Sequence, residues 1–209
     1  MVKMKIQTLV LGMVATNCYF LLNADTKEMI LVDPADEVET IKDKVNAMEG
    51  RPVAVLLTHG HYDHILAADS VRKIYQIPVY IHELDERSLK DASLNLSKFW
   101  RSSFTMKADR LLKHGDELHL ADFGVRVLHT PGHTVGSACY YFQEQKALMS
   151  GDTMFFRSYG RTDFPTSSML DMKKSIRRLL QELPDDTIVY PGHEMSTTIA
   201  MEKKYNPLA

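Results

Sequence analysis

Thr58-His59-Gly60-His61-Tyr62-Asp63-His64 is the most informative segment of this chain. A random match to its H-x-H-x-D-H pattern is expected about once in a thousand chains of this size and composition. The apolar run 53–57 before it predicts a strand, and a helix is expected to begin near His64. The segment is therefore expected to form a tight loop at the carboxyl end of a strand, where open α/β sheets usually build their sites.

The spacing within this segment separates the side chains into two groups. His59 and His61 point the same way if the segment is extended, because side chains alternate with period two. Asp63 and His64 follow where the chain turns into the helix, so they can face a second point nearby. Imidazole suits zinc and carboxylate suits harder ions, so the mixture predicts zinc, with iron or manganese as alternatives. The competing interpretation is a solvated polar loop. It is disfavoured because four side chains of the types that bind metals lie within six residues.

Three more polar residues each follow a predicted strand and lie beside glycine. The predicted strands cover residues 125–129, 147–149 and 187–190, and they lead to His133, Asp152 and His193. Glycine permits the sharp turns and close backbone approach that a crowded metal site needs. Each of the three alone is more often a turn residue, but together with the histidine segment they favour a metal site.

Short apolar runs alternate with helical patterns along the rest of the chain. Further strands are expected at residues 5–11, 18–22, 29–32, 79–81 and 139–142. Helices are expected at 38–48, 66–74 and 169–179, and Ser168 with Asp171 forms a capping box before the last of them. This mixture predicts a layered α/β fold with helices outside, in one domain spanning residues 1–209.

The segment 93–107 is the least periodic part of the chain. It contains four large side chains: Phe99, Trp100, Arg101 and Phe104. An ordered loop over a site is one interpretation, and plain core packing or a subunit contact is equally consistent with the composition.

The composition of the chain limits the kinds of partner that we expect the protein to bind. The net charge of -2 argues against a nucleic-acid-binding surface, and two cysteines without CxxC spacing favour a reducing compartment, so we expect a cytoplasmic protein. Lys3 and Lys5 before the apolar run 9–15 faintly resemble a signal peptide, but Gly12 interrupts that run and a first strand is favoured. No apolar run reaches the roughly 18 residues that a membrane span needs. A small-molecule substrate is therefore expected, and the oligomeric state stays open.

Together these motifs resemble the metallo-β-lactamase fold superfamily, and within it the glyoxalase II-like branch, the hydroxyacylglutathione hydrolases. The resemblance implies an αββα sandwich with metals at one edge between two sheets. It also implies that His59, His61 and His133 bind a first metal, that Asp63, His64 and His193 bind a second, and that Asp152 bridges them. The segments that carry it are Asn17-Cys18-Tyr19, Val32-Asp33-Pro34, 59–64, 130–134, 151–153, 160–164, 191–194 and Asn206-Pro207.

The resemblance implies hydrolysis of a thioester such as S-lactoylglutathione by a hydroxide held between two zinc ions, with Asp63 or Asp152 relaying the proton. Two features depart from full-length glyoxalase II. Only residues 194–209 follow His193, where that enzyme has a helical extension that grips glutathione. Its lysine-x-tyrosine contact is replaced by Arg161-Thr162-Asp163. Arg161 is a candidate for binding a substrate carboxylate, and an ion pair with Asp163 or Asp33 is an equal alternative.

Asp33 and the remaining histidines complete the predictions. Asp33 is expected to position the 59–64 loop, although a turn role beside Pro34 is nearly as well supported. Cys18 and Cys139 are expected in the core. The remaining histidines match no motif and are expected to be surface or strand residues: His82, His114, His119 and His129.

A second enzyme class uses almost the same ligands. The persulfide dioxygenases of this superfamily resemble the chain in the histidine segment and at residues 160–164, and they bind one iron through two histidines and an aspartate. Their last histidine usually lies in Pro-Ala-His-Asp, whereas this chain has Pro191-Gly192-His193-Glu194, which favours the hydrolase. Drug-directed lactamase activity, nuclease activity and a non-enzymatic metal-binding role are less favoured.

Overall fold

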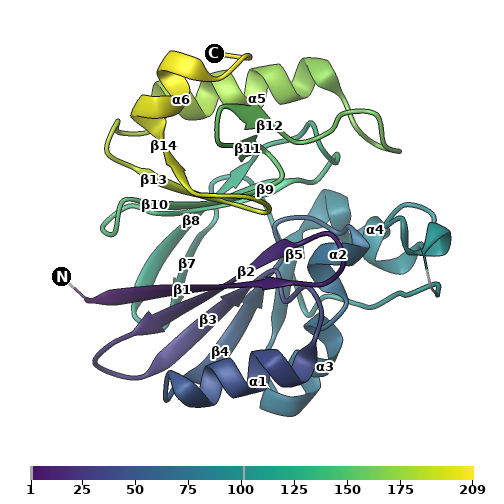
Figure 1. The fold of residues 1–209 in the computed structure, drawn as a ribbon, viewed down its shortest axis with the longest axis vertical. Coiled ribbons are helices and arrows are strands. Elements are labelled where there is room, and N and C mark those ends of the chain that lie inside the picture. Colours follow the sequence, from purple (N-terminus) through teal and green to yellow (C-terminus); the bar gives the residue numbers. More distant parts are fainter. Residues whose placement is uncertain (1, 101) are drawn as a thin grey trace.

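Two stacked β-sheets with helices on their outer faces form the fold (Figure 1). The computed structural model describes residues 2–100 and 102–209. Within these residues the two large sheets have six strands each, in the orders β1-β2-β3-β4-β5-β6 and β14-β13-β10-β9-β8-β7. Helices α1 and α3 cover the first sheet and α5 and α6 cover the second (Figure 1). The αββα sandwich predicted from the sequence is confirmed.

The first sheet begins with antiparallel strands and continues with parallel ones. Its strands are β1 (Met4–Leu11), β2 (Thr16–Asn23), β3 (Glu28–Val32), β4 (Arg51–Leu56), β5 (Val79–His82) and β6 (Arg110–Leu112). The helical segments between them are α1 (Val38–Ala47), α2 (Tyr62–Ile65), α3 (Ala68–Tyr75), η1 (Glu83–Asp85), α4 (Glu86–Lys90) and η2 (Ser97–Phe99). Because β3, β4 and β5 are parallel, the loops after them emerge at the same edge of the sheet.

The second sheet is antiparallel except where β13 joins β10. Its strands are β7 (Glu117–Leu120), β8 (Phe123–His129), β9 (Ala138–Phe142), β10 (Ala147–Gly151), β13 (Ile188–Pro191) and β14 (Thr197–Thr198). A small ribbon of β11 (Met154–Phe155) and β12 (Ser158–Tyr159) follows β10, and the helices are α5 (Met169–Glu182) and α6 (Ile199–Tyr205). The parallel step from β10 to β13 brings the loops after these strands to one edge of the sheet.

Alternation along each strand divides the core into three apolar layers. In β2, Cys18, Phe20 and Leu22 pack toward α1 and α3, whereas Tyr19 and Leu21 face the second sheet. A third layer lies between the second sheet and α5. Both faces of each sheet are therefore covered, which explains why many strands are continuously apolar in sequence.

The chain segments predicted from hydrophobic patterns are present, with ends that differ by no more than two residues except in α5, which continues three residues beyond the predicted end to Glu182. The Ser168 side chain caps α5 by accepting from the backbone N–H of Asp171, as predicted. The helix after the histidine segment begins at Tyr62, two residues before His64, with His61 as its N-cap. The elements that the patterns missed are short: β6, β7, β11, β12, β14, η1, η2, α4 and α6.

The structure also bears on the expectations about cysteines and membranes. Cys18 and Cys139 are buried in the core, as predicted, and both are free cysteines. Within residues 2–100 and 102–209, no helix has the length and apolar character that crossing a bilayer requires.

Candidate metal centre

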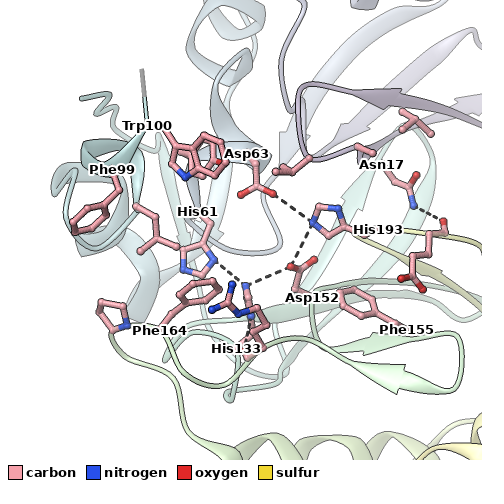
Figure 2. A pocket seen from close by; sticks show the side chains of 18 of the residues that line it. Asn17, His61, Asp63, Phe99, Trp100, His133, Asp152, Phe155, Phe164 and His193 are labelled. Carbon is pink, nitrogen blue, oxygen red and sulfur yellow. Dashed lines mark hydrogen bonds and ion pairs between the residues drawn. The ribbon is translucent and has the colours of Figure 1, made fainter. Parts of the chain in front are cut away.

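All seven predicted metal ligands meet at one edge of the sandwich, between the sheets. Figure 2 labels those that line the cavity there. Their potential ligand atoms form three overlapping sets, and within each set these atoms lie no more than 4.8 Å apart. The sets are His59 with His61 and His133, His59 with His64 and Asp152, and Asp63 with His64 and His193.

Neighbouring ligand atoms in the cluster are about as far apart as two ligands of the same metal ion are. His133 Nε2 lies 3.4 Å from Asp152 Oδ2, and His193 Nε2 lies 3.4 Å from Asp63 Oδ2 and 3.6 Å from Asp152 Oδ2. Two ligands of a tetrahedral zinc, each bound at about 2.0–2.1 Å, are about 3.4 Å from each other. Oδ2 of Asp152 thus approaches both His133 and His193, and Oδ1 lies 3.4 Å from His64 Nε2, so this carboxylate contacts histidines of both ends of the cluster.

Several buried polar atoms of the cluster lack a hydrogen-bond partner among the described residues. They are Nε2 of His59, His61 and His64, and Oδ1 of Asp152. Leaving a buried polar atom unsatisfied costs about 1–3 kcal/mol. A cation held among these atoms satisfies them together, so the donor set fits a divalent metal.

Burial and neighbouring charges set the protonation of the cluster. Burial, with His133 beside it, lowers the pKa of His61 to about 3, and burial lowers the pKa of His59 as well. These imidazoles are therefore neutral at pH 7, the form that binds a metal. At His64, burial alone would lower the pKa, but Asp63, Asp152 and Asp33 together raise it well above the ordinary value. Carboxylates that stabilise an imidazolium at this point also stabilise a metal cation.

Asp33 orients the histidine loop, as predicted. Its carboxylate accepts hydrogen bonds from the Thr58 backbone N–H at 2.8 Å and from Thr58 Oγ1 at 2.6 Å. His64 Nδ1 donates to the same carboxylate at 2.9 Å, so that Nε2 faces Asp63 and Asp152. Such contacts fix the tautomer and the ring orientation of metal-binding histidines.

His133 is held in the same way by the backbone. Its Nδ1 donates to the Arg161 carbonyl at 2.8 Å, so the Nε2 lone pair faces the cluster. That nitrogen lies 2.8 Å from His61 Nδ1. The chain after β8 and the segment around Arg161 therefore position this ligand jointly.

Asp85 is an important residue that the sequence did not reveal. It lies in η1 after β5, is fully buried, and accepts from Gly60 N–H at 2.7 Å, Gly136 N–H at 3.1 Å and Thr134 Oγ1 at 3.0 Å. It therefore joins the loop of His59 and His61 to the loop of His133. In sequence it sits in an acidic run that is typical of an exposed helix start, so no local signal distinguishes it.

Gly192 shows why glycine accompanies these ligands. A Cβ at this position would lie 2.1 Å from Asp152 Oδ1 and 2.7 Å from His64 Cε1. Such distances are far below van der Waals contact, so a side chain here would displace both ligands. The prediction that the crowded site needs close backbone approach is confirmed at this position.

A cavity of about 1110 Å³ opens over the cluster. Among the described residues of segment 93–107, Leu96, Phe99 and Trp100 line it, which supports the interpretation of this segment as an ordered loop over the site. Arg101 lies outside the described residues.

Arg161 also lines the cavity, but its guanidinium is already paired. Its Nε and Nη2 donate to the Asp163 carboxylate at 2.9 and 2.8 Å, and it lies over the Phe164 ring at 4.2 Å. Of the alternatives that the sequence left open, the structure contains the ion pair with Asp163. The Asp33 carboxylate instead binds Thr58 and His64.

The fold and the histidine–aspartate cluster define a metal-dependent enzyme. The family model of the metallo-beta-lactamase superfamily matches residues 11–193, and the chain belongs to this superfamily. The probable metallo-hydrolase YqgX of Bacillus subtilis is 37% identical over 98% of this chain and 97% of its own length. Hydroxyacylglutathione hydrolase GloC of Haemophilus influenzae is 32% identical over 91% of both chains.

Solved structures agree with this assignment over nearly the whole chain. BLEG-1 B3 metallo-beta-lactamase is 39% identical with a TM-score of 0.92, covering 97% of this chain and 98% of that one. TTHA1623 in a di-iron-bound form is 33% identical with a TM-score of 0.86, covering 97% and 100%. ETHE1 from Myxococcus xanthus is 30% identical with a TM-score of 0.81, covering 97% and 83%. The protein is thus a metallo-hydrolase of the superfamily and fits its compact glyoxalase II-like branch.

Proposed function

We propose that the protein hydrolyses thioesters at a centre that holds two metal ions, with zinc as the metal. The observation that carries this proposal is the arrangement of two histidine-rich ligand sets that share Asp152. The name of the GloC relative supports a thioester substrate. Among the described residues that line the cavity there is no serine or cysteine, so this wall offers no hydroxyl or thiol of the serine or cysteine type for a covalent acyl-enzyme.

The proposed ligand assignment follows the clustering of the side chains. His59, His61 and His133 hold the first metal, because their ring nitrogens form one compact set. A second set of side chains holds the other metal, and the Asp152 carboxylate contacts one histidine of each set. The second set consists of Asp63, His64 and His193.

The reaction joins water to the acyl carbon and breaks the C–S bond. When bound, the metals supply Lewis acidity, which acidifies a water molecule and polarises the acyl carbonyl. Asp63 and Asp152 line the cavity and are the proposed proton acceptors. Burial opposes ionisation of Asp63, but His64 and His193 lower its pKa to about 2, so it can accept a hydrogen bond from the attacking water. One water proton ends on the departing thiol, and the carboxylic acid product releases the other.

Metal analysis combined with a substrate panel tests the proposal. We expect about two zinc ions per chain, cleavage of S-lactoylglutathione or simple acyl thioesters, and loss of activity on chelation that added zinc restores. The panel includes a β-lactam because BLEG-1, to which this chain is similar, is a B3 metallo-beta-lactamase. Thioester cleavage by metal-free protein that ignores chelators would overturn the proposal.

A mononuclear iron persulfide dioxygenase is the second candidate. His59, His64 and Asp152 form a set of two histidines and one carboxylate, a ligand combination that suits non-haem iron. The likeness to ETHE1 adds weight to this candidate. One iron per chain, with O₂ uptake on glutathione persulfide and no thioester cleavage, would favour it over the hydrolase.

A further inference from the structure

The wall of the cavity above the metal centre is strongly apolar. Its volume of about 1110 Å³ exceeds what a two- or three-carbon acyl group can fill, since pockets for drug-sized ligands span about 300–1,000 Å³. Figure 2 shows Phe99, Trp100, Phe155 and Phe164 arranged around the histidine–aspartate cluster. The hairpin of β1 and β2 contributes Val10 and Val14. Apolar side chains thus line the path from the metal centre to the solvent.

Several apolar side chains that line this cavity are largely exposed to solvent. Val10 is 62% exposed, Phe99 71% and Met195 63%, although they come from three separate parts of the chain. Large apolar residues that gather around one opening typically mark a binding site. Covering them with an apolar ligand removes apolar surface from water, which favours binding.

Two polar side chains of this wall outside the metal cluster, Asn17 and Arg161, are already bonded to other parts of the protein. Asn17 Nδ2 donates to the Pro191 carbonyl at 3.0 Å and to the Glu194 carbonyl at 2.9 Å. Among the described lining residues Arg161 is the single arginine or lysine, and its guanidinium pairs with Asp163. Glutathione carries two terminal carboxylates, and the described residues of this wall include no unpaired arginine or lysine to receive them.

We propose that the preferred substrates are thioesters of medium-chain apolar acyl groups, with the acyl chain lying along the wall formed by Val10, Val14, Phe99 and Trp100. This inference rests on the proposed thioester hydrolysis. Biological thiols that carry acyl groups are polar, so the apolar part of such a thioester is its acyl chain. With the acyl carbon at the metal centre, the chain extends over the apolar wall while the thiol portion points to solvent.

A homologous series of substrates measures this preference. The metal-loaded protein is assayed with acetyl, butyryl, hexanoyl and octanoyl thioesters of N-acetylcysteamine, a small neutral thiol, and with S-lactoylglutathione. We expect kcat/KM to rise by about threefold to fourfold per methylene until the acyl chain covers the wall. Each methylene that the wall buries lowers the free energy of the bound transition state, and this fold-change is the corresponding increase in rate. We expect kcat/KM to be higher for the hexanoyl thioester than for S-lactoylglutathione.

Matched variants connect the chain-length dependence to this wall. Trp100→Ala and, separately, Phe99→Ala are expected to reduce the increase per methylene. Ile74→Ala is the control, because Ile74 is an exposed apolar residue on α3 that does not line the cavity. It is expected to retain the wild-type dependence on chain length.

The outcomes separate the two proposals. A flat chain-length series, a preference for S-lactoylglutathione over hexanoyl thioester, or an unchanged dependence in both aromatic variants overturns this inference while thioester hydrolysis stands. Failure of the metal-loaded protein to cleave any thioester rejects the proposed function itself.

Discussion

His61 and Asp63 belong to different proposed metal positions although one residue separates them. We expect His61→Ala and Asp63→Ala each to lower kcat/KM by at least about a hundredfold, because even residues that only orient metal ligands contribute 10–100-fold. Each variant should also lose bound metal, measured by elemental analysis, while circular dichroism shows a retained fold.

His119→Ala is the matched control for these substitutions. His119 lies on β7 with its side chain 74% exposed and is not one of the clustered residues. It should keep wild-type activity and metal content. Equal activity in all three variants would contradict the assignment of the site.

Asp85 should matter for stability as well as for the site. Asp85→Ala leaves the buried N–H groups of Gly60 and Gly136 without their acceptor, so the free energy of unfolding should fall by about 2–4 kcal/mol. Urea denaturation measures this loss. Glu83→Ala, in the same short η1 segment, removes an exposed side chain and should change stability by less than about 0.5 kcal/mol. Similar losses of stability in both variants would show that the Asp85 hydrogen bonds do not hold these loops together.

The contrast between Asp33 and Asp85 shows what sequence can predict about single residues. Asp33 follows a recognisable strand and stands in the Val32-Asp33-Pro34 motif, so its contact with the histidine loop was expected. The partners of Asp85 are 25 to 51 residues away in the chain, and three segments must pack before they meet. Hydrogen bonds of this kind depend on tertiary packing and leave no local pattern.

At the level of elements, α5 is the support for the loop that carries His133. Ser168 N–H, at the start of α5, donates to the Gly132 carbonyl at 2.8 Å. Gly132 has a φ of +150°, and a Cβ there would lie 2.4 Å from Cα of Met172. The helix and the loop are therefore in backbone contact, which only glycine allows.

Gly132→Ala should push α5 and the His133 loop apart. We expect a loss of about 2–4 kcal/mol in the free energy of unfolding, from overpacking and the unfavourable φ, together with weaker metal binding. Thermal denaturation and metal titration measure the two effects. Gly124→Ala on β8 is the control, since a Cβ there meets nothing within 4 Å. If Gly132→Ala behaves like this control, the contact does not position His133.

The elements that the sequence missed differ physically from those it predicted. Central strands such as β2 and β9 are buried along their whole length, so they read as apolar runs, whereas β7 alternates between exposed and half-buried residues at the edge of its sheet. Strands such as β11 and β14 have two residues each and exist only through pairing with neighbours. A periodic pattern cannot develop over so few residues.

At the scale of the whole molecule, the site is the place where the two sheets are joined. Asp33 and the histidine loop come from the first sheet, whereas His133, Asp152 and His193 follow strands of the second. The Asn17 backbone N–H on β2 donates to the Gly192 carbonyl at 2.7 Å across the same edge. The sequence predicted the two groups of ligands, and the resemblance supplied the way in which the sheets bring them together. The prediction of one domain over residues 1–209 stays a prediction.

Metal binding should therefore stabilise the entire fold and not only the active loops. A metal at 1,000 times its Kd adds about 4 kcal/mol to the free energy of unfolding. For a chain of 209 residues each kcal/mol shifts Tm by about 2–4 °C, so Tm should rise by about 8–16 °C when chelated protein is reloaded with zinc. Differential scanning calorimetry with parallel metal analysis measures the shift.

Two variants show whether this stabilisation acts through the junction of the sheets. Asp152→Ala removes the carboxylate that faces both ligand sets, so most of the zinc-induced rise in Tm should disappear. His119→Ala should keep the full rise, because its side chain lies outside the cluster. A rise that survives in Asp152→Ala would mean that zinc binds elsewhere, and identical Tm values for the chelated and loaded wild type would mean that metal does not link the sheets.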